Sequence, residues 1–209
     1  MNCDICDTHF DPEYCCPDCY AEWVEENKMH EKEEDLFTVA ATGSRSLQTA
    51  TPAVKKAVWE YLIAQFTTLK EKYGKNLRVM SGIAEGFDKA FALAALSLDI
   101  RVIAVIPNRG YGAYYWGRNS LTGLDKLAEF NSILERCEEV VYVMEDVHNT
   151  KDLYLDRDNK KVHSNFVRNE YMVEHADAFY VYDKTSRGTS HCFKHITKAE
   201  LPYKEVPMA

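Results

Sequence analysis

The sequence predicts one α/β domain over residues 36–209, built as a doubly wound parallel sheet, with a small zinc-binding appendage at the N-terminus. Short apolar runs of strand length alternate with longer segments of helical periodicity. Such alternation requires crossover connections, and these make neighbouring strands parallel and cover both faces of the sheet. Polar, glycine-containing turns follow several of the apolar runs, and no internal repeat is present.

The first half of this domain predicts three strands and two helices. An apolar run over 36–41 predicts a strand that ends in the polar turn 42–45. Pro52 suits the start of a helix and Tyr73-Gly74 suits its end. The apolar face of that helix recurs at three- and four-residue spacing, at Val54, Val58, Leu62, Phe66 and Leu69. The elements that follow are a strand over 77–80, a helix over 88–98 and a strand over 101–106.

The second half continues the alternation but contains two long insertions. The expected elements are a helix over 124–136, a strand over 140–144, a helix over 163–176, a strand over 178–182, a helix ending near Lys198 and a short strand over 203–206. The insertions cover 108–123 and 145–162, and loops of such length are commonly functional or disordered. The first is rich in tyrosine and carries Trp116 between two arginines, which suits either a lid over a nucleobase or packing onto the domain.

The net charge of −8 belongs to the N-terminus. Residues 1–35 hold twelve acidic residues and two lysines, whereas 36–209 hold 21 acidic and 23 basic residues. A phosphate backbone attracts cations, so this acidic head suits a basic protein partner better than nucleic acid. No apolar stretch reaches the length of a membrane span and no secretory signal pattern is present, so we expect a cytoplasmic protein.

Five cysteines lie within residues 3–19, and four of them form two C-x2-C pairs: Cys3, Cys6, Cys16 and Cys19. Two such pairs supply the four thiolates of a structural zinc site. Cys15 or His9 could replace one of these ligands. We therefore expect a Zn²⁺ knuckle over 1–24, followed by a charged linker or helix over 25–35. Its role would be docking, oligomerisation of a homo-oligomer, or structural capping.

Three segments fall at carboxyl ends of predicted strands, where open parallel sheets bind ligands. Backbone amides, hydroxyl groups and a guanidinium at these turns suit a phosphate group. The phosphate-binding candidates are Gly43, Ser44, Arg45, Gly82, Gly86, Gly188 and Thr189. Asp88, in the first turn of a helix, suits a ribose hydroxyl or a helix cap. Arg168 and Asn169 lie on the helix that precedes the strand over 178–182.

Together these motifs resemble the SLOG superfamily, which includes DprA, the LOG phosphoribohydrolases and YpsA-like proteins. The resemblance rests on Gly43-Ser44-Arg45, the turn over 81–88, Arg168-Asn169 with Asp177, and Gly188-Thr189, and it covers about 36–206. It implies a Rossmann-like nucleotide-binding domain whose site lies at these turns. Trp116 falls where YpsA-like proteins tend to carry a tryptophan, and it or a neighbouring tyrosine would contact the base.

The leading hypothesis is a protein that binds a nucleotide or a nucleotide-derived ligand. LOG-type enzymes carry a glutamate where this chain has Cys192, and a thiol cannot stabilise an oxocarbenium ion as a carboxylate does. An N-glycosidase is the alternative, with Glu85 or Glu170 as the acidic group. A DprA-like binder of single-stranded DNA is the third hypothesis, and the near-neutral domain makes nucleic acid an unlikely partner.

His191 and His195 are spaced i, i+4 on the last predicted helix, with Cys192 between them. This spacing is compatible with a metal site, because it places both rings on one helix face. No third ligand stands beside them in a known motif, so a surface or subunit-contact role is the expectation.

The knuckle predicts that protein purified without chelator under reducing conditions retains at least about one tightly held Zn²⁺ per chain. The double variant Cys16→Ser/Cys19→Ser is expected to lose this equivalent, because two thiolates cannot close the tetrahedron. Elemental analysis against protein concentration measures both. Recovery below about 0.3 equivalents in the unaltered chain would contradict the knuckle.

Overall fold

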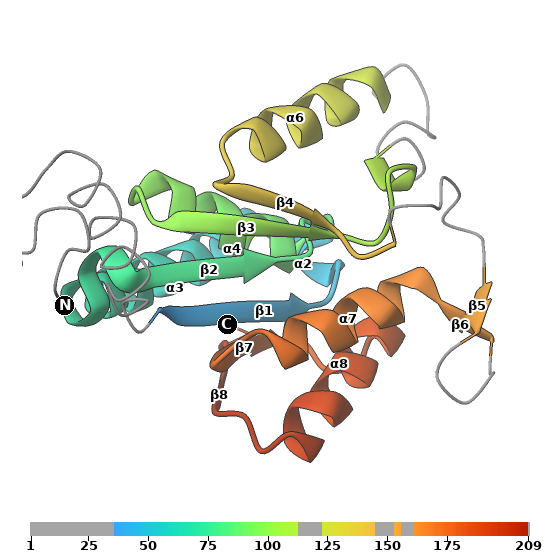
Figure 1. The fold of residues 1–209 in the computed structure, drawn as a ribbon. Coiled ribbons are helices and arrows are strands. Elements are labelled where there is room, and N and C mark those ends of the chain that lie inside the picture. Colours follow the sequence, from blue (N-terminus) through green and yellow to red (C-terminus); the bar gives the residue numbers. More distant parts are fainter. Residues whose placement is uncertain (1–35, 113–122, 145–152, 156–160, 209) are drawn as a thin grey trace, which may run out of the picture. The chain divides into compact units, whose positions relative to one another are not determined.

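A computed structural model of the chain describes residues 36–112, 123–144, 153–155 and 161–208. It contains a six-stranded, wholly parallel sheet in the order β4-β3-β2-β1-β7-β8 (Figure 1). The strands are β1 (Phe37–Gly43), β2 (Leu77–Ser81), β3 (Arg101–Ile106), β4 (Glu139–Tyr142), β7 (Ala178–Tyr182) and β8 (Tyr203–Glu205). The predicted α/β class with a parallel sheet is confirmed.

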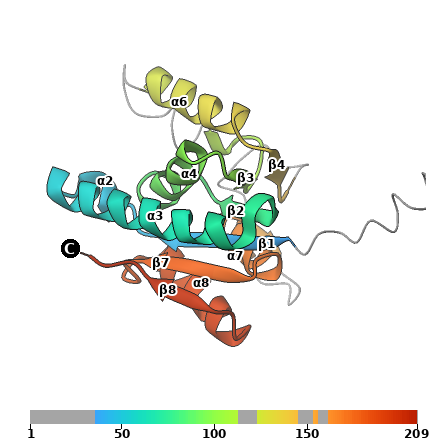
Figure 2. The ribbon, with the colours of Figure 1, turned by 90° about the vertical axis from the view of Figure 1, so that its left-hand side faces the viewer.

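Helices cover both faces of the sheet, as Figure 2 shows. One face carries α3 (Pro52–Tyr73), α4 (Phe87–Ser97) and α6 (Gly123–Glu135). The opposite face carries α7 (Ser164–Glu174) and α8 (Arg187–Lys198). Two short elements follow β1 and α3: the one-turn helix α2 (Ser46–Thr49) and the 3-10 turn η1 (Gly74–Asn76). The domain is therefore a three-layer, doubly wound structure.

Successive side chains of each strand point to opposite faces of the sheet, and this alternation divides the core into two apolar layers. In β1, Val39 and Ala41 pack toward α3 and α4, whereas Ala40 between them packs toward α7 and α8. The same alternation holds in β7, where Tyr180 joins the first layer and Val181 joins the second. Strands buried on both faces read as continuous apolar runs, which is why the sequence pattern identified them.

The predicted bounds of α3 are confirmed, and local chemistry sets them. Thr51 caps the N-terminus by accepting a hydrogen bond from the Val54 N–H at 3.3 Å, and Pro52 fills the first helical position. Gly74 ends the helix with a φ of 56°, in the left-handed region that glycine occupies without steric cost. Between these ends, Val58, Leu62 and Phe66 form the buried face, as their spacing predicted.

Three elements were not expected from the sequence. The segment directly after the turn 42–45 forms α2, where the sequence predicts no element. The second insertion contains an antiparallel pair, β5 (Leu153–Leu155) and β6 (Lys161–His163), where no secondary structure was expected. Three-residue strands are too short for an alternation pattern to stand out in sequence, so neither strand could be recognised. Among the described helices, none combines the length and the apolarity required to cross a membrane.

The strand order fixes where a ligand can bind. The chain winds outward from β1 through β2 and β3 to β4, then returns to place β7 on the other side of β1. Winding therefore changes direction between β1 and β7, and β1 pairs with β7 from Val39↔Ala178 to Gly43↔Tyr182. In open α/β sheets, a crevice for ligands forms beyond the carboxyl ends of the strands at this switch point.

The backbone conformation of Gly86 predicts that a substitution at this position lowers the stability of the fold. Its φ of 97° is strained for other residues, and an added Cβ would lie 2.8 Å from Arg45 Cα and from the Ser44 carbonyl oxygen. Gly86→Ala is expected to lower the free energy of unfolding by about 1–3 kcal/mol, measured by chemical denaturation. Gly188→Ala is the control, because a Cβ there meets no atom within 4 Å. Equal stabilities of the two variants would contradict this account.

Candidate functional site

A pocket of about 730 Å³ opens beyond the carboxyl ends of β1 and β7, at the switch point. Three segments line it, together with the single residues Ala84 and Tyr111: the turn after β1, the N-terminus of α8, and the first half of α7 with the residue before it. The lining residues are Thr42, Gly43, Ser44, Arg45, Ala84, Tyr111, His163, Asn165, Phe166, Arg168, Asn169, Ser186, Arg187, Gly188, Thr189 and His191.

The turns after β1 and β7 are fastened to each other. The Ser44 N–H donates to the Tyr182 carbonyl oxygen at 3.1 Å, which extends the pairing of the two strands into the turns. The Ser46 hydroxyl donates to the Asp183 carboxylate at 2.6 Å. Hydrogen bonds from Ser46 and Thr185 hold the pKa of Asp183 below its ordinary value. Two of the pocket walls are therefore rigidly connected at their base.

The N-terminus of α8 is capped by Ser186. Its Oγ accepts from the Thr189 N–H at 3.2 Å and lies 2.7 Å from the Thr189 hydroxyl. The first turn of a helix leaves several N–H groups without an intrahelical acceptor, and those of Arg187 and Gly188 precede the capped one. An anion placed there meets backbone donors and the positive end of the helix dipole.

Arg168 is the central side chain of the site, and only 8% of its surface is exposed. Its Nη1 donates to the Gly82 carbonyl oxygen at 3.2 Å, and its Nη2 donates to Asn169 Oδ1 at 3.0 Å. Asn169 in turn donates through Nδ2 to the Gly188 carbonyl oxygen at 3.2 Å. The guanidinium thus connects α7 to the turn after β2, and Asn169 connects α7 to α8.

Asp88 lies behind this guanidinium, with 4% of its surface exposed. Its Oδ1 accepts from the Gly43 N–H at 3.1 Å, and its Oδ2 lies 3.9 Å from Arg168 Nη2. Burial raises the pKa of Asp88 to about 6, although Arg168, the Gly43 N–H and Arg45 act in the opposite direction. Asp88 therefore holds the turn after β1 in place, and it does not line the pocket.

The predicted ligand-binding residues divide into two groups. Seven of them line the pocket together: Gly43, Ser44, Arg45, Arg168, Asn169, Gly188 and Thr189. Gly82, Gly86 and Asp88 lie behind the lining, where the two glycines allow close packing. An added Cβ at Gly82 would lie 2.4 Å from Arg168 Nη1. Trp116 and the four zinc-ligand candidates Cys3, Cys6, Cys16 and Cys19 fall outside the described residues, as do Cys15 and His9.

Neither carboxylate considered as a catalytic acid lines the pocket. Glu85 is ion-paired with Lys126 at 2.8 Å and accepts from Gln48 Nε2 at 3.1 Å. Glu170 faces His191 and His195 on α8, at 3.7 and 3.8 Å. Cys192, at the position of the LOG glutamate, packs in the second apolar layer, and burial raises the pKa of its thiol to about 12.

Several lining residues escaped the sequence interpretation. His163, Asn165 and Phe166 come from the end of β6 and the start of α7, directly after the insertion over 145–162. Phe166 lies two residues before Arg168, and that proximity was the available signal. His191 follows Thr189 by two residues and stacks on Phe166, with ring centroids 4.1 Å apart. Burial, followed by His195, Lys194 and Arg187, lowers the pKa of His191 to about 4.

Fold and site together define a Rossmann-like α/β domain with an open, arginine-lined pocket at its switch point. The fold is similar to that of DNA processing protein A (DprA) from Streptococcus pneumoniae, with a TM-score of 0.52 and 17% sequence identity. The match covers 82% of this chain and 50% of DprA, so the chain spans about half the length of that protein. This likeness shows the fold.

A second similar structure is DprA from Helicobacter pylori, described for its single-stranded DNA binding mode. It matches with a TM-score of 0.49 and 16% identity, over 82% of this chain and 65% of that one. No protein-family model matches the chain. No curated protein matches it either.

Asp88 predicts a pH-dependent stability. Because its pKa rises from 3.8 to about 6 on folding, the protonated form stabilises the fold at low pH, and that contribution is lost as pH rises through about 6. Asp88→Asn retains an acceptor for the Gly43 N–H without the buried charge. The variant should match the unaltered chain near pH 4 and exceed its free energy of unfolding by on the order of 2 kcal/mol at pH 8.

Denaturant unfolding at both pH values measures this difference. Glu60→Gln is the control for removing a carboxylate, because Glu60 is exposed and pairs with Lys56 four residues earlier, at 3.7 Å. Exposed ion pairs contribute little to stability, so this variant should not reproduce the gain of Asp88→Asn at pH 8. A stability advantage of Asp88→Asn that is the same at both pH values would show that Asp88 titrates normally.

Proposed function

We propose that the pocket binds a nucleotide or a nucleotide-derived ligand through its phosphate groups. The observation that carries the proposal is the charge of the lining: Arg45, Arg168 and Arg187 line the pocket, and no Asp or Glu does so among the residues that the structure describes. Three guanidinium groups without a lining carboxylate make the pocket electropositive, which favours an anionic ligand.

Backbone geometry supports the same ligand. The first turn of α8 presents the N–H groups of Arg187 and Gly188 at the pocket, whereas the Gly43 and Ser44 N–H groups of the turn after β1 are engaged with Asp88 and Tyr182. Helix N-termini bind phosphate through such amides, and arginine binds it with two parallel hydrogen bonds. The side chains of Ser186 and Thr189 are engaged with each other, so we assign the phosphate to the amides of Arg187 and Gly188.

The size of the pocket favours a ligand larger than inorganic phosphate. About 730 Å³ lies within the range of roughly 300–1,000 Å³ typical of sites for small organic molecules. Tyr111 and Phe166 add aromatic surface to the lining. We propose that Trp116, or a tyrosine of the same insertion, contacts the base, and that the zinc knuckle over 1–24 serves docking or assembly of a homo-oligomer.

Isothermal titration of the full chain with nucleoside mono-, di- and triphosphates, their parent nucleosides and a single-stranded oligonucleotide tests this function. Phosphorylated compounds should bind, and the nucleosides should bind at least about tenfold more weakly, because each lost charge-assisted hydrogen bond costs about 1.5–3 kcal/mol. Arg187→Ala should weaken phosphate-dependent binding by about tenfold or more for the same reason. Lys56→Ala, which removes an exposed cation from α3, is the matched control.

The outcomes separate the hypotheses. Equal binding of nucleosides and nucleotides, or equal loss in Arg187→Ala and Lys56→Ala, would overturn a phosphate-binding pocket. Strongly salt-dependent binding of the oligonucleotide alone would assign the site to single-stranded DNA instead. Free base released during incubation, and abolished in Glu85→Gln or Glu170→Gln, would identify an N-glycosidase.

A further inference from the structure

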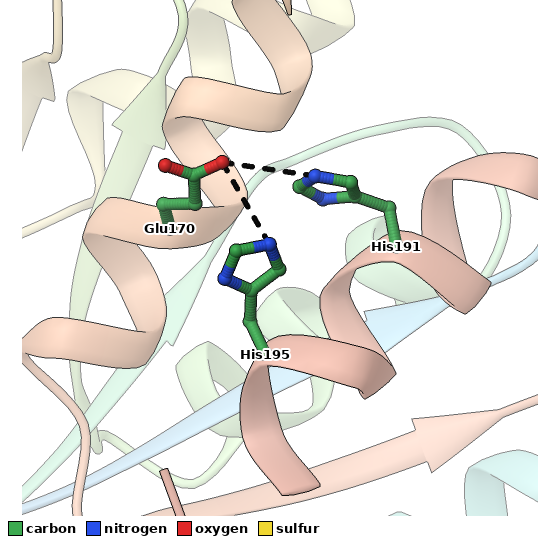
Figure 3. A group of neighbouring side chains, drawn as sticks. All are labelled: Glu170, His191 and His195. Carbon is green, nitrogen blue, oxygen red and sulfur yellow. Dashed lines mark ion pairs between the residues drawn. The ribbon is translucent and has the colours of Figure 1, made fainter. Parts of the chain in front are cut away.

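We propose that Glu170, His191 and His195 form a binding site for a divalent transition-metal ion. The three side chains come from two neighbouring helices and point toward one another, as Figure 3 shows. Glu170 lies on α7, and the two histidines lie one turn apart on α8. One ligand atom from each residue lies within 4.8 Å of the others, which is the arrangement of a three-ligand metal site.

The distances fit a small metal ion. Glu170 Oε1 lies 3.7 Å from His191 Nε2 and 3.8 Å from His195 Nε2. Around zinc, with bonds of about 2.0–2.2 Å, tetrahedral donors lie about 3.3–3.5 Å apart. The donor atoms of all three residues lie within 4.8 Å of one another, so side-chain movements of up to about 1 Å would bring them onto one ion.

The donor set defines the class of metal. Imidazole nitrogen suits Zn²⁺, Cu²⁺, Ni²⁺ and Fe²⁺, whereas Mg²⁺ and Ca²⁺ prefer oxygen ligands throughout. Two histidines and one carboxylate leave at least one coordination position open, which is typical of sites that bind water or a substrate. Zn²⁺ is therefore the appropriate probe, and Mg²⁺ is the negative control.

The surrounding structure holds the ligands in place. The ring of Phe166 stacks on His191 with an interplanar angle of 6°, which restricts the rotation of the imidazole. Apolar residues of the second core layer, among them Met172 of α7 and Ile196 of α8, pack on the sheet side of the two helices. The spacing of Glu170 from the histidines is therefore fixed by the fold.

The site is accessible and lies at the edge of the pocket. The side chains of Glu170, His191 and His195 are 38%, 22% and 35% exposed, so an ion can enter from solvent. His191 also lines the pocket. Lys194 and Arg187 act electrostatically on His191, and their positive charges disfavour the binding of a metal cation. The carboxylate of Glu170 is the nearby negative charge that offsets them.

Calorimetric titration of the full, chelator-treated chain with Zn²⁺ tests the proposal. Glu170→Gln and His195→Ala should each lose one binding event or weaken it at least about tenfold, because each removes a donor. His175→Ala is the matched control: it removes an exposed imidazole that stacks on Tyr171, with ring centroids 4.0 Å apart, outside the cluster. Any zinc that the N-terminal cysteines bind would contribute equally to all four proteins and cancel in the comparison.

A second measurement uses the unaltered chain and needs no variant to fold. In protein labelled with ¹⁵N-histidine, saturating Zn²⁺ should shift the Nε2 resonances of His191 and His195 and leave those of His175 unchanged, whereas Mg²⁺ should shift none. Unmoved Nε2 resonances at saturation, or zinc affinities equal in all four proteins, would overturn the proposal. Nucleotide binding is measured without metal, so the two proposals fail separately.

Discussion

The buried guanidinium of Arg168 is the constraint on which the candidate site depends. A charge removed from water needs partners, and Arg168 obtains them from the Gly82 carbonyl oxygen, the Asn169 side chain and Asp88. These partners come from three separate segments, so their positions are fixed relative to one another. The guanidinium also occupies the space that a side chain at position 82 would fill. The turn after β2 therefore requires glycine at position 82, because the guanidinium group of Arg168 lies beside it.

The buried guanidinium of Arg168 also explains a feature of the site that lowers the stability of the fold. Asp88 is buried deeply enough to raise its pKa to about 6, yet it bonds to the backbone of the turn after β1 through the Gly43 N–H. At neutral pH, the pocket therefore has an anion directly behind its cationic lining. Such a carboxylate orients Arg168 and limits how far its positive charge spreads. Stability is given up to hold the pocket in one geometry, which is characteristic of functional sites.

The sequence was sufficient for most of the fold, because both faces of the sheet are covered. Val39 to Ala41 and Ala178 to Tyr182 are apolar on both sides, so their strands stand out as short continuous runs between amphipathic helices. Motifs at strand ends were located correctly for the same reason, since their position follows from the strand. The pair β5 and β6 could not be predicted, because three-residue strands carry too little periodicity.

Most of the predicted residues that line the pocket follow strands directly, whereas Arg168 and Asn169 were identified from a motif on the helix before β7. Phe166 and His163 reach the pocket from the start of α7 and the residue before it, and their proximity to Arg168 in the sequence is a weak signal of that approach. The contact of Glu170 with the two histidines depends on the rotation of α7 against α8, which is a property of tertiary packing. The position of Asp88 in the first turn of α4 was predicted, whereas its burial beside Arg168 depends on tertiary packing and was not.

The pairing of β1 with β7 also has a consequence for how the protein is made. The Thr38 N–H donates to the Asp177 carboxylate 139 residues later. The two turns that form walls of the pocket follow the strands of this long-range pairing. A ribosome synthesises the chain from the N-terminus, so β1 emerges long before its partner strand. Until then, one edge of β1 is unpaired and the pocket does not exist. A nascent chain can therefore build the layer of α3 and α4 early, but it acquires a ligand site only after α8 has left the ribosome.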